Sequence, residues 1–474
     1  MIIQPKNLYL FIFLSTQLLG SAAYSAESLN TKVHNQYNSF RALGMGNAFT
    51  AVADDYSGLM YNPAALAKRK KGEFQFTIAG AGLATKTTKL AKDIDDASKS
   101  ATTESAKAQA ISDALEPYYG APLGARIQAL EFFWARPNWG IALIPLDLSI
   151  DIGVHRQLGP ALDLNIKKDT TLAYAYAKEI NDTLAAGITA KLIHRDSVEQ
   201  SVSALELASD SNILSASRFK EGINADFDLG FMWNPKWLTI TKVIMQEEPE
   251  KEITPVIPAE SEEKKKEIIN DAETTRDPQS EPATELVTTK SEDTDLNLPT
   301  DEIVPAKPVE KVKPIKKEAA IKKIKKVKVT RNPLNLSLVV RNVISANFSK
   351  SNQINKEALE PPSRNPRVID IGSNYEFAKW DSLTLRTTLD FRNLLHPNTT
   401  IRKSTHAGFE FDYSPNGWFK TQLRGGINQM YYTAGVTLLF GILEVDAVTY
   451  GEEVGTATTN VENRVIAAKI GMNF

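Results

Sequence analysis

The side chains that could carry metal or nucleophilic chemistry are few in this sequence. It contains no cysteine, which excludes disulfides, thiolate metal ligands and cysteine nucleophiles together. No nucleophile–base–orienter set, paired-carboxylate motif or phosphate-binding loop stands out. The five histidines are scattered without a short ligand spacing, and they are His34, His155, His194, His396 and His406. We therefore expect no enzyme active site, no metal site and no cofactor.

A glycine pair near the N-terminus, Gly44 and Gly46, suggests a dinucleotide-binding loop at first sight. Phe49 stands where that fingerprint needs its third glycine, and no strand precedes the motif, so we reject this interpretation. The two glycines instead predict close backbone packing or a positive φ. Asn62 followed by Pro63 predicts the N-cap and the first position of a short helix.

The charged residues lie at alternate positions of otherwise apolar segments. Between Ile223 and Trp233, for example, apolar side chains alternate with Asn224, Asp226 and Asp228. A strand of this kind has one face for lipid and one for a polar lumen, as in a transmembrane β-barrel. A soluble β-sandwich shows the same alternation, so the connections between strands must decide.

Fourteen such segments can be counted, and short connections between them alternate with long ones near residues 84–126, 196–221 and 345–366. Outer-membrane barrels have short periplasmic turns and long external loops. Tryptophans stand beside the short turns, like an interfacial aromatic girdle, and they are Trp134, Trp139, Trp233, Trp237, Trp380 and Trp418. We therefore predict an all-β fold, a transmembrane antiparallel β-barrel of about 14 strands.

Both ends of the chain agree with export to the outer membrane. Lys6, an apolar run and small residues near Ala23 predict a signal peptide over residues 1–25. At the other end, Ile470, Met472 and Phe474 share one face of the last strand. A terminal aromatic of this kind resembles the signal that the barrel-assembly machinery recognises. We expect this strand to close the barrel against the first, near residues 74–83.

Residues 240–331 break the strand pattern and are predicted to form a disordered, charged insert on the periplasmic side. Residues 246–303 hold 18 acidic and 6 basic residues, whereas residues 304–331 hold 11 basic and 2 acidic ones. A solvated linker and a tether to anionic lipid headgroups, peptidoglycan or a periplasmic protein both remain open. The tether would use Lys316, Lys317, Lys322, Lys323, Lys325 and Lys326. Net charge near zero argues against nucleic-acid binding.

The segments beginning at Arg41 (RALGMG), Ala51 (AVADD) and Tyr61 (YNPA) resemble the N-terminal hatch of the FadL-like outer-membrane superfamily. That superfamily includes long-chain fatty-acid transporters, PorV-type secretion barrels and TraF-like barrels. The resemblance implies a hatch over residues 26–72, and the strand count places six strands over 73–239 and eight over 332–474. The hatch or ligand residues implied are Gly44, Gly46, Asn62, Pro63 and Ala64.

In the transporters of this superfamily, a hydrophobic ligand leaves sideways at a kinked third strand. Here the third predicted strand contains Pro145, which removes a hydrogen-bond donor from the ladder. Pro145 thus marks either a lateral opening or a bulge that only bends the wall. We expect a hatch-gated transporter of hydrophobic, fatty-acid-like molecules. The alternative is a structural barrel of a secretion, conjugation or envelope complex, and the hatch disfavours an open porin.

Overall fold

The computed structural model describes residues 32–33, 36–155, 161–209, 218–247, 324–351, 356–358, 360–379, 382–456 and 459–474. The expected signal peptide and Lys316, Lys317, Lys322 and Lys323 lie outside these ranges. The chain divides into two compact units, residues 1–240 with 330–474, and residues 241–329. No helix among the described residues is long and apolar enough to cross a membrane.

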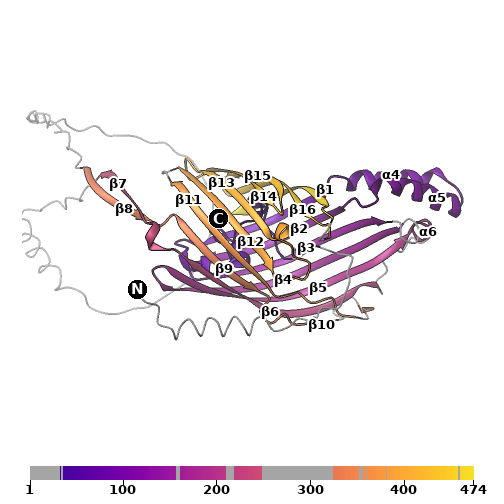
Figure 1. The fold of residues 1–474 in the computed structure, drawn as a ribbon, viewed down its shortest axis with the longest axis horizontal. Coiled ribbons are helices and arrows are strands. Elements are labelled where there is room, and N and C mark those ends of the chain that lie inside the picture. The colour runs from indigo at the N-terminus through magenta and orange to yellow at the C-terminus, as the bar shows by residue number, and fades with distance from the viewer. Residues whose placement is uncertain are drawn as a thin grey trace, which may run out of the picture. The chain divides into compact units, whose positions relative to one another are not determined.

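Within the described residues, fourteen antiparallel strands form a closed ring (Figure 1). The ring closes because β1 pairs with β17 and β6 pairs with β9. This confirms the predicted barrel and the pairing of its last strand with its first. The strands are β1 (Glu73–Ala84), β2 (Leu123–Arg136), β3 (Trp139–His155), β4 (Ala161–Asn181), β5 (Leu184–Ser203), β6 (Lys220–Trp233), β9 (Leu334–Arg341), β11 (Val368–Lys379), β12 (Leu383–Leu394), β13 (Thr405–Tyr413), β14 (Phe419–Asn428), β15 (Tyr431–Phe440), β16 (Leu443–Glu453) and β17 (Glu462–Asn473).

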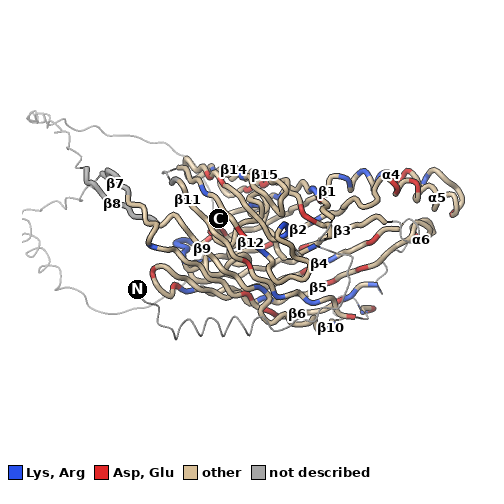
Figure 2. The backbone as a smooth tube through the Cα atoms, viewed as in Figure 1, with Lys and Arg blue, Asp and Glu red and all other residues tan. Residues whose placement is uncertain are grey.

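Side chains of the strands alternate between an exposed apolar face and a buried polar one. On β17, Ile466 is 61 % exposed on the outer face, whereas Lys469 is 4 % exposed on the inner face. Charged residues of both signs are spread along the strands in Figure 2. A belt of exposed Leu, Ile and Phe around a closed ring suits lipid and not water. The alternation therefore sets which face of each strand meets the membrane.

The two ends of the barrel differ in their connections. At the short-turn end, two-residue turns join β2 to β3 and β4 to β5. At the loop end lie α4 (Thr87–Ser100), α5 (Glu104–Leu115), η2 (Glu116–Tyr118) and α6 (Ala204–Ser209), where α4 and α5 extend beyond the strands (Figure 1). The loop end also holds α8 (Ile401–Ser404) and β10 (Ser349–Lys350), which pairs with β6. One loop-end connection is short, since only Gln429 and Met430 join β14 to β15.

Residues 36–72 lie inside the ring, and we call them the lumenal segment. The segment contains α2 (Phe40–Gly44), α3 (Gly58–Tyr61) and η1 (Pro63–Lys68). Phe49, Val52 and Tyr61 are buried in one cluster with Ala185 of β5 and Met232 of β6. The ends of these short helices leave buried backbone N–H and C=O groups unpaired within the helix. Those groups therefore need hydrogen-bond partners from nearby side chains or from the wall.

Two strands extend into the segment that was expected to be disordered. They are β7 (Ile240–Glu247) and β8 (Ile324–Arg331), which pair as a separate two-stranded sheet, and η4 (Lys236–Leu238) precedes them. Both strands are rich in β-branched residues, which favour extended backbone. Lys325 and Lys326 lie on β8. The charge-rich middle of the insert, residues 248–323, lies outside the described residues.

Candidate functional site

Asn62 and Pro63 form a helix start that also fixes the lumenal segment to the wall. Asn62 caps η1, because its Oδ1 accepts a hydrogen bond from the Ala64 backbone N–H at 3.1 Å. Its Nδ2 donates to the carbonyl of Thr50 at 2.9 Å and to that of Phe231, on β6, at 3.3 Å. Asn62 is fully buried, so these hydrogen bonds take the place of those that its side chain would otherwise make with water. The sequence predicted the cap, and the fold adds the bond to the wall.

Two wall glycines make room for this turn, and the sequence reading missed them. A Cβ at Gly230 would collide with the side chains of Asn62 and Pro63. A Cβ at Gly187 would collide with the backbone of Pro63 and Ala64. The two glycines face each other on β5 and β6. What distinguishes these two glycines is that they occupy facing positions on neighbouring strands. That relationship can be seen only when the strand register is known.

Gly46 holds the lumenal segment against β13 to β15. Its φ is +66°, and a Cβ there would collide with the carbonyl oxygens of Ala407 and Ile427. The Gly46 N–H donates to Thr433 Oγ1 at 3.0 Å, and the His406 Nδ1–H donates to the Gly46 carbonyl at 2.8 Å. Gly46 therefore meets both the positive φ and the close packing expected of it.

Gly44 lies two residues earlier, at the end of α2. Its carbonyl accepts a hydrogen bond from Thr433 Oγ1 at 3.0 Å. It also approaches Gly435 closely, because a Cβ on Gly44 would lie 3.2 Å from the Gly435 Cα. Larger side chains at this contact would push α2 away from β15.

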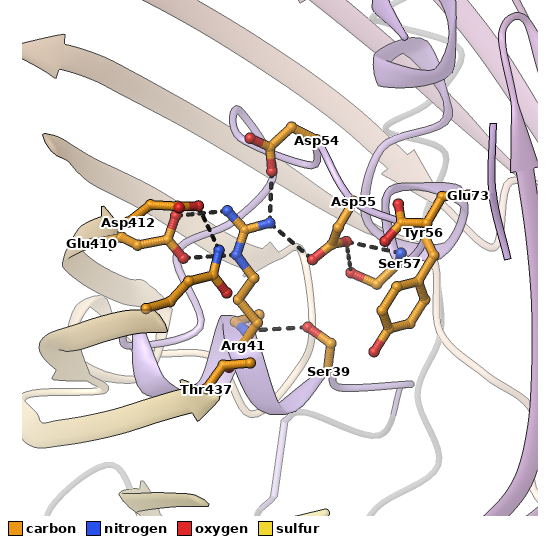
Figure 3. A network of polar contacts seen from close by, with 12 residues as sticks. Ser39, Arg41, Asp54, Asp55, Tyr56, Ser57, Glu73, Glu410, Asp412 and Thr437 are labelled. Atoms are coloured by element: carbon orange, nitrogen blue, oxygen red, sulfur yellow. Dashed lines mark hydrogen bonds and ion pairs between the residues drawn. The ribbon is translucent and has the colours of Figure 1, made fainter. Parts of the chain in front are cut away.

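A charged network centred on Arg41 joins the lumenal segment to the wall (Figure 3). The Arg41 guanidinium donates to both oxygens of Glu410, on β13, at 2.7 and 2.6 Å. It also donates to Asp54 at 2.7 Å and to Asp55 at 3.0 Å. Arg386 of β12 donates to Asp54 from the wall at 2.5 Å. Paired guanidinium and carboxylate groups of this kind give strong, directional bonds.

Asp54 is the most exposed member of this network. Burial by itself would raise its pKa, but the guanidinium groups of Arg386 and Arg41 outweigh burial and hold the pKa well below its usual range. The Asp54 side chain is 44 % exposed, so solvent screens part of this attraction. The carboxylate stays ionised, and the lumenal segment stays paired with two wall strands.

A second buried network satisfies the backbone of the lumenal segment. Asp390 accepts hydrogen bonds from the backbone N–H groups of Phe49 and Thr50, each at 2.8 Å. Arg341 donates to the carbonyls of Met60 and Tyr61 at 2.6 and 2.7 Å. These contacts supply the partners that irregular backbone inside a barrel requires.

The barrel wall has an irregular seam at Ile78, Leu130 and Pro145, which lie side by side on β1, β2 and β3. The pairing of β1 with β17 shifts at Ile78, and the pairing of β3 with β4 shifts between Ile144 and Asp147. Leu130 has a φ of +56°, an uncommon conformation for a bulky residue, and it is 52 % exposed. We call these three residues the wall seam.

Pro145 therefore lies at a bulge, a feature common to both alternatives that the sequence left open. Its carbonyl accepts a hydrogen bond from Thr170 Oγ1, on β4, at 2.8 Å. A side chain thus supplies a hydrogen bond between β3 and β4 where their pairing shifts, so the seam is bridged at this point.

A cavity of about 480 Å³ lies at the loop end of the barrel. Its lining surface is mostly apolar and includes Leu123, Val154 and Val461, together with charged groups such as Lys32 and Asp151. The Lys32 Nζ pairs with Asp151 at 2.8 Å and with Glu452, on β16, at 3.1 Å. A smaller cavity of about 20 Å³ is lined by Phe40 of the lumenal segment and by Asp147 of β3, just beyond the wall seam.

The proposed assembly residues lie where β17 closes the ring. Phe474 is 58 % exposed and exchanges two backbone hydrogen bonds with Phe74, at 2.8 and 3.0 Å. Ile470 is 40 % exposed, and Met472 pairs with Phe76. Of the six lysines of the suggested tether, only Lys325 and Lys326 fall within described backbone, on β8. Ile470, Met472 and Phe474 take no part in the lumenal networks described above.

No protein-family model matches the chain, and no curated protein is similar to it in sequence. Among solved structures it is similar to the CymD monoaromatic hydrocarbon channel (TM-score 0.39, 8 % identity, 91 % of this chain and 96 % of that one). It is also similar to the Ralstonia pickettii toluene transporter TbuX (0.39, 9 %, 93 % and 98 %). A FadL homologue of Pseudomonas aeruginosa scores 0.33 at 9 % identity, with 95 % and 98 % covered. Similarity this distant concerns the fold alone and carries no argument about activity.

Proposed function

We propose that this protein is a FadL-like outer-membrane barrel that carries hydrophobic, fatty-acid-like molecules across the membrane. The loop-end cavity carries this proposal, because about 480 Å³ of mostly apolar lining with a few charged groups suits a small hydrophobic ligand. The loop end then faces the outside, and the short-turn end faces the periplasm. Lys32, beside Asp151, is placed to meet the polar end of a ligand.

The ligand leaves the lumen sideways, through the wall seam, into the outer-membrane lipid. Strained backbone such as that of Leu130 persists where the surrounding structure holds it, often at functional sites. A side-chain bond from Thr170 to the Pro145 carbonyl bridges the bulge between β3 and β4, where the regular pairing shifts. Breaking this bond costs less than parting a regular ladder, which supports an opening here.

The lumenal segment acts as the hatch of this barrel. Asn62, Pro63 and Ala64 form the turn that would have to leave the wall for the hatch to open, because they pack directly against Gly187 and Gly230. Gly44 and Gly46 hold the opposite end of the segment against β15. The exposed Ile470 and Phe474 and the half-buried Met472, at the closing strand, serve the barrel-assembly machinery as its recognition signal.

Uptake by cells tests the proposal. Cells that lack their own fatty-acid transporter would express the full chain, and the uptake of a labelled long-chain fatty acid, a monoaromatic hydrocarbon and a small sugar would be measured. We expect fatty-acid uptake without sugar uptake. Val461→Trp, which fills the cavity, should reduce it several-fold, whereas Ile401→Trp, at an 82 % exposed position, should not. Equal passage of the sugar would indicate a porin, and no uptake would refute transport.

A structural barrel with a periplasmic tether remains the second candidate. The observation that favours it is the separate β7–β8 sheet, which holds the two ends of the charged insert together. Deleting residues 248–323 would leave both strands in place. Loss of peptidoglycan or periplasmic-protein co-purification would support a tether, and unchanged co-purification would remove it.

A further inference from the structure

Three side chains on β5 and β6 come within metal-binding distance of one another. A ring nitrogen of His194 and one carboxylate oxygen each from Asp196 and Glu221 all lie within 4.8 Å of each other. The His194 Nε2 is 2.9 Å from Glu221 Oε1. Neither the lumenal networks nor the loop-end cavity includes these three residues.

The strand alternation places this group on the outer face of the barrel. Thr189 of β5 points inward, because its hydroxyl donates to the lumenal segment at the Leu59 carbonyl. His194 and Asp196 belong to the other row, which includes Leu192 at 48 % exposure. Asp196 pairs with Glu221 across the ladder, so all three side chains share one face. The group continues the apolar outer row toward the loop end.

One oxygen of this group is buried and has no partner among the described residues. Asp196 is 8 % exposed, and its Oδ1 accepts no hydrogen bond there. Its other oxygen accepts from Lys168 Nζ at 3.1 Å. Glu221 is fully buried and accepts from Ser351 Oγ at 2.9 Å. A buried carboxylate oxygen without a partner is costly, and a cation would supply what is missing.

We propose that His194, Asp196 and Glu221 bind a divalent transition metal of the zinc class. One imidazole and two carboxylates are a donor set that suits Zn²⁺, with a fourth position open to water. The ion would take the place of the direct bond between His194 and Glu221, and Lys168 would keep the other oxygen of Asp196.

Such an ion would fasten the part of β6 that β9 does not reach. β9 covers β6 only from Leu229 to Trp233, and β10 pairs with it at just two positions above that. The Ser351 N–H donates to the Glu221 carbonyl at 3.1 Å, directly beside the metal ligands. A metal shared by β5 and β6 therefore stabilises the stretch of β6 whose other side has only the short β10 pairing.

Metal titration of the purified full chain tests this site. After removal of metal by a chelator, Zn²⁺ would be titrated in a calorimeter, and Co²⁺ would report coordination through its visible absorption. We expect one ion per chain, and a loss of affinity of about 100-fold or more in His194→Ala. His396→Ala removes a histidine outside the group and should leave binding unchanged.

Heat-dependent gel mobility would show that each variant is folded. If His194→Ala does not fold, Asp196→Asn replaces the unpartnered carboxylate with a neutral group of the same size and should weaken binding as strongly. The proposal is overturned if the folded wild type binds no ion. It is equally overturned if a folded variant of His194 or Asp196 binds Zn²⁺ as tightly as the wild type.

Discussion

Arg41 and Glu410 are 369 residues apart in the chain, yet the Arg41 guanidinium donates to both oxygens of the Glu410 carboxylate, at 2.7 and 2.6 Å. One residue belongs to the lumenal segment and the other to β13. The Glu410 side chain is fully buried, and that of Arg41 is 11 % exposed. This pair therefore joins the contents of the lumen to the wall in a place that water barely reaches.

Arg41→Ala should destabilise the barrel by about 3 kcal/mol, because it leaves the buried Glu410 without its main partner. Arg386 and Arg424 remain near Glu410, at 3.5 and 3.8 Å. Because their charges still partly compensate the Glu410 carboxylate, the expected loss of stability is at the lower end of the range for broken buried ion pairs. Denaturant unfolding in detergent would measure it.

The control for Arg41 is Lys99→Ala, which removes an ion pair with Asp95 whose side chains are 71 % and 56 % exposed. This change should cost less than about 1 kcal/mol. A double-mutant cycle of Arg41→Ala with Glu410→Gln should be strongly non-additive. Additive effects would show that the two side chains act independently.

Thr170→Val should weaken the wall seam, because valine keeps the shape of threonine but cannot donate to the Pro145 carbonyl. We expect a loss of about 1 kcal/mol in stability and faster uptake of hydrophobic solutes. Thr449→Val is the matched control, since Thr449 Oγ1 donates to the Val465 carbonyl between β16 and β17, at 3.2 Å. Equal uptake by both variants would argue against an exit at the seam.

A reversible disulfide would show whether the lumenal segment must move. Thr50 Oγ1 and Ser337 Oγ, on β9, are 3.0 Å apart, so Thr50→Cys with Ser337→Cys places two sulfurs close to bonding distance. The chain has no other cysteine. We expect the oxidised protein to lose uptake and the reduced protein to recover it, with Ser337→Cys alone as the control. Full uptake in the oxidised state would mean that ligands pass without hatch motion.

His396 should make the loop before β13 sensitive to acid. Its Nδ1 accepts a hydrogen bond from the Asn398 N–H at 3.2 Å, which requires the unprotonated ring. Burial first, and the nearby Lys403 second, lower the pKa of His396 from 6.5 to about 4. The unfolded chain then binds more protons between these two values, so the stabilisation is complete above pH 6.5 and lost as the pH falls toward about 4.

Melting temperatures measured across this pH range would test the effect. The wild type should lose more stability on acidification than His396→Gln, which cannot take up the proton. Parallel pH profiles for the two proteins would show that His396 does not contribute.

The sequence alone was sufficient to predict the barrel, but not the β7–β8 sheet. Alternation with a period of two depends only on neighbouring residues, so it indicated the strands, their number and their lipid-facing sides. It also placed Ile466 outside and Lys469 inside on the closing strand, as the structure has them. The cap at Asn62 and the bulge at Pro145 were likewise readable, because each follows from the local chemistry of one or two residues.

Only the tertiary structure decided which polar residues meet. Arg41 finds Glu410, Asn62 lies against Gly230, and the wall seam passes through three strands because ring closure and register bring these positions together. The His194 group shows the same limit. His194 and Asp196 are two positions apart on one strand, a spacing that predicts a shared face, but nothing local shows that Glu221 lies opposite. A sequence pattern fixes the side of a strand, whereas the partner across it depends on pairing between distant segments.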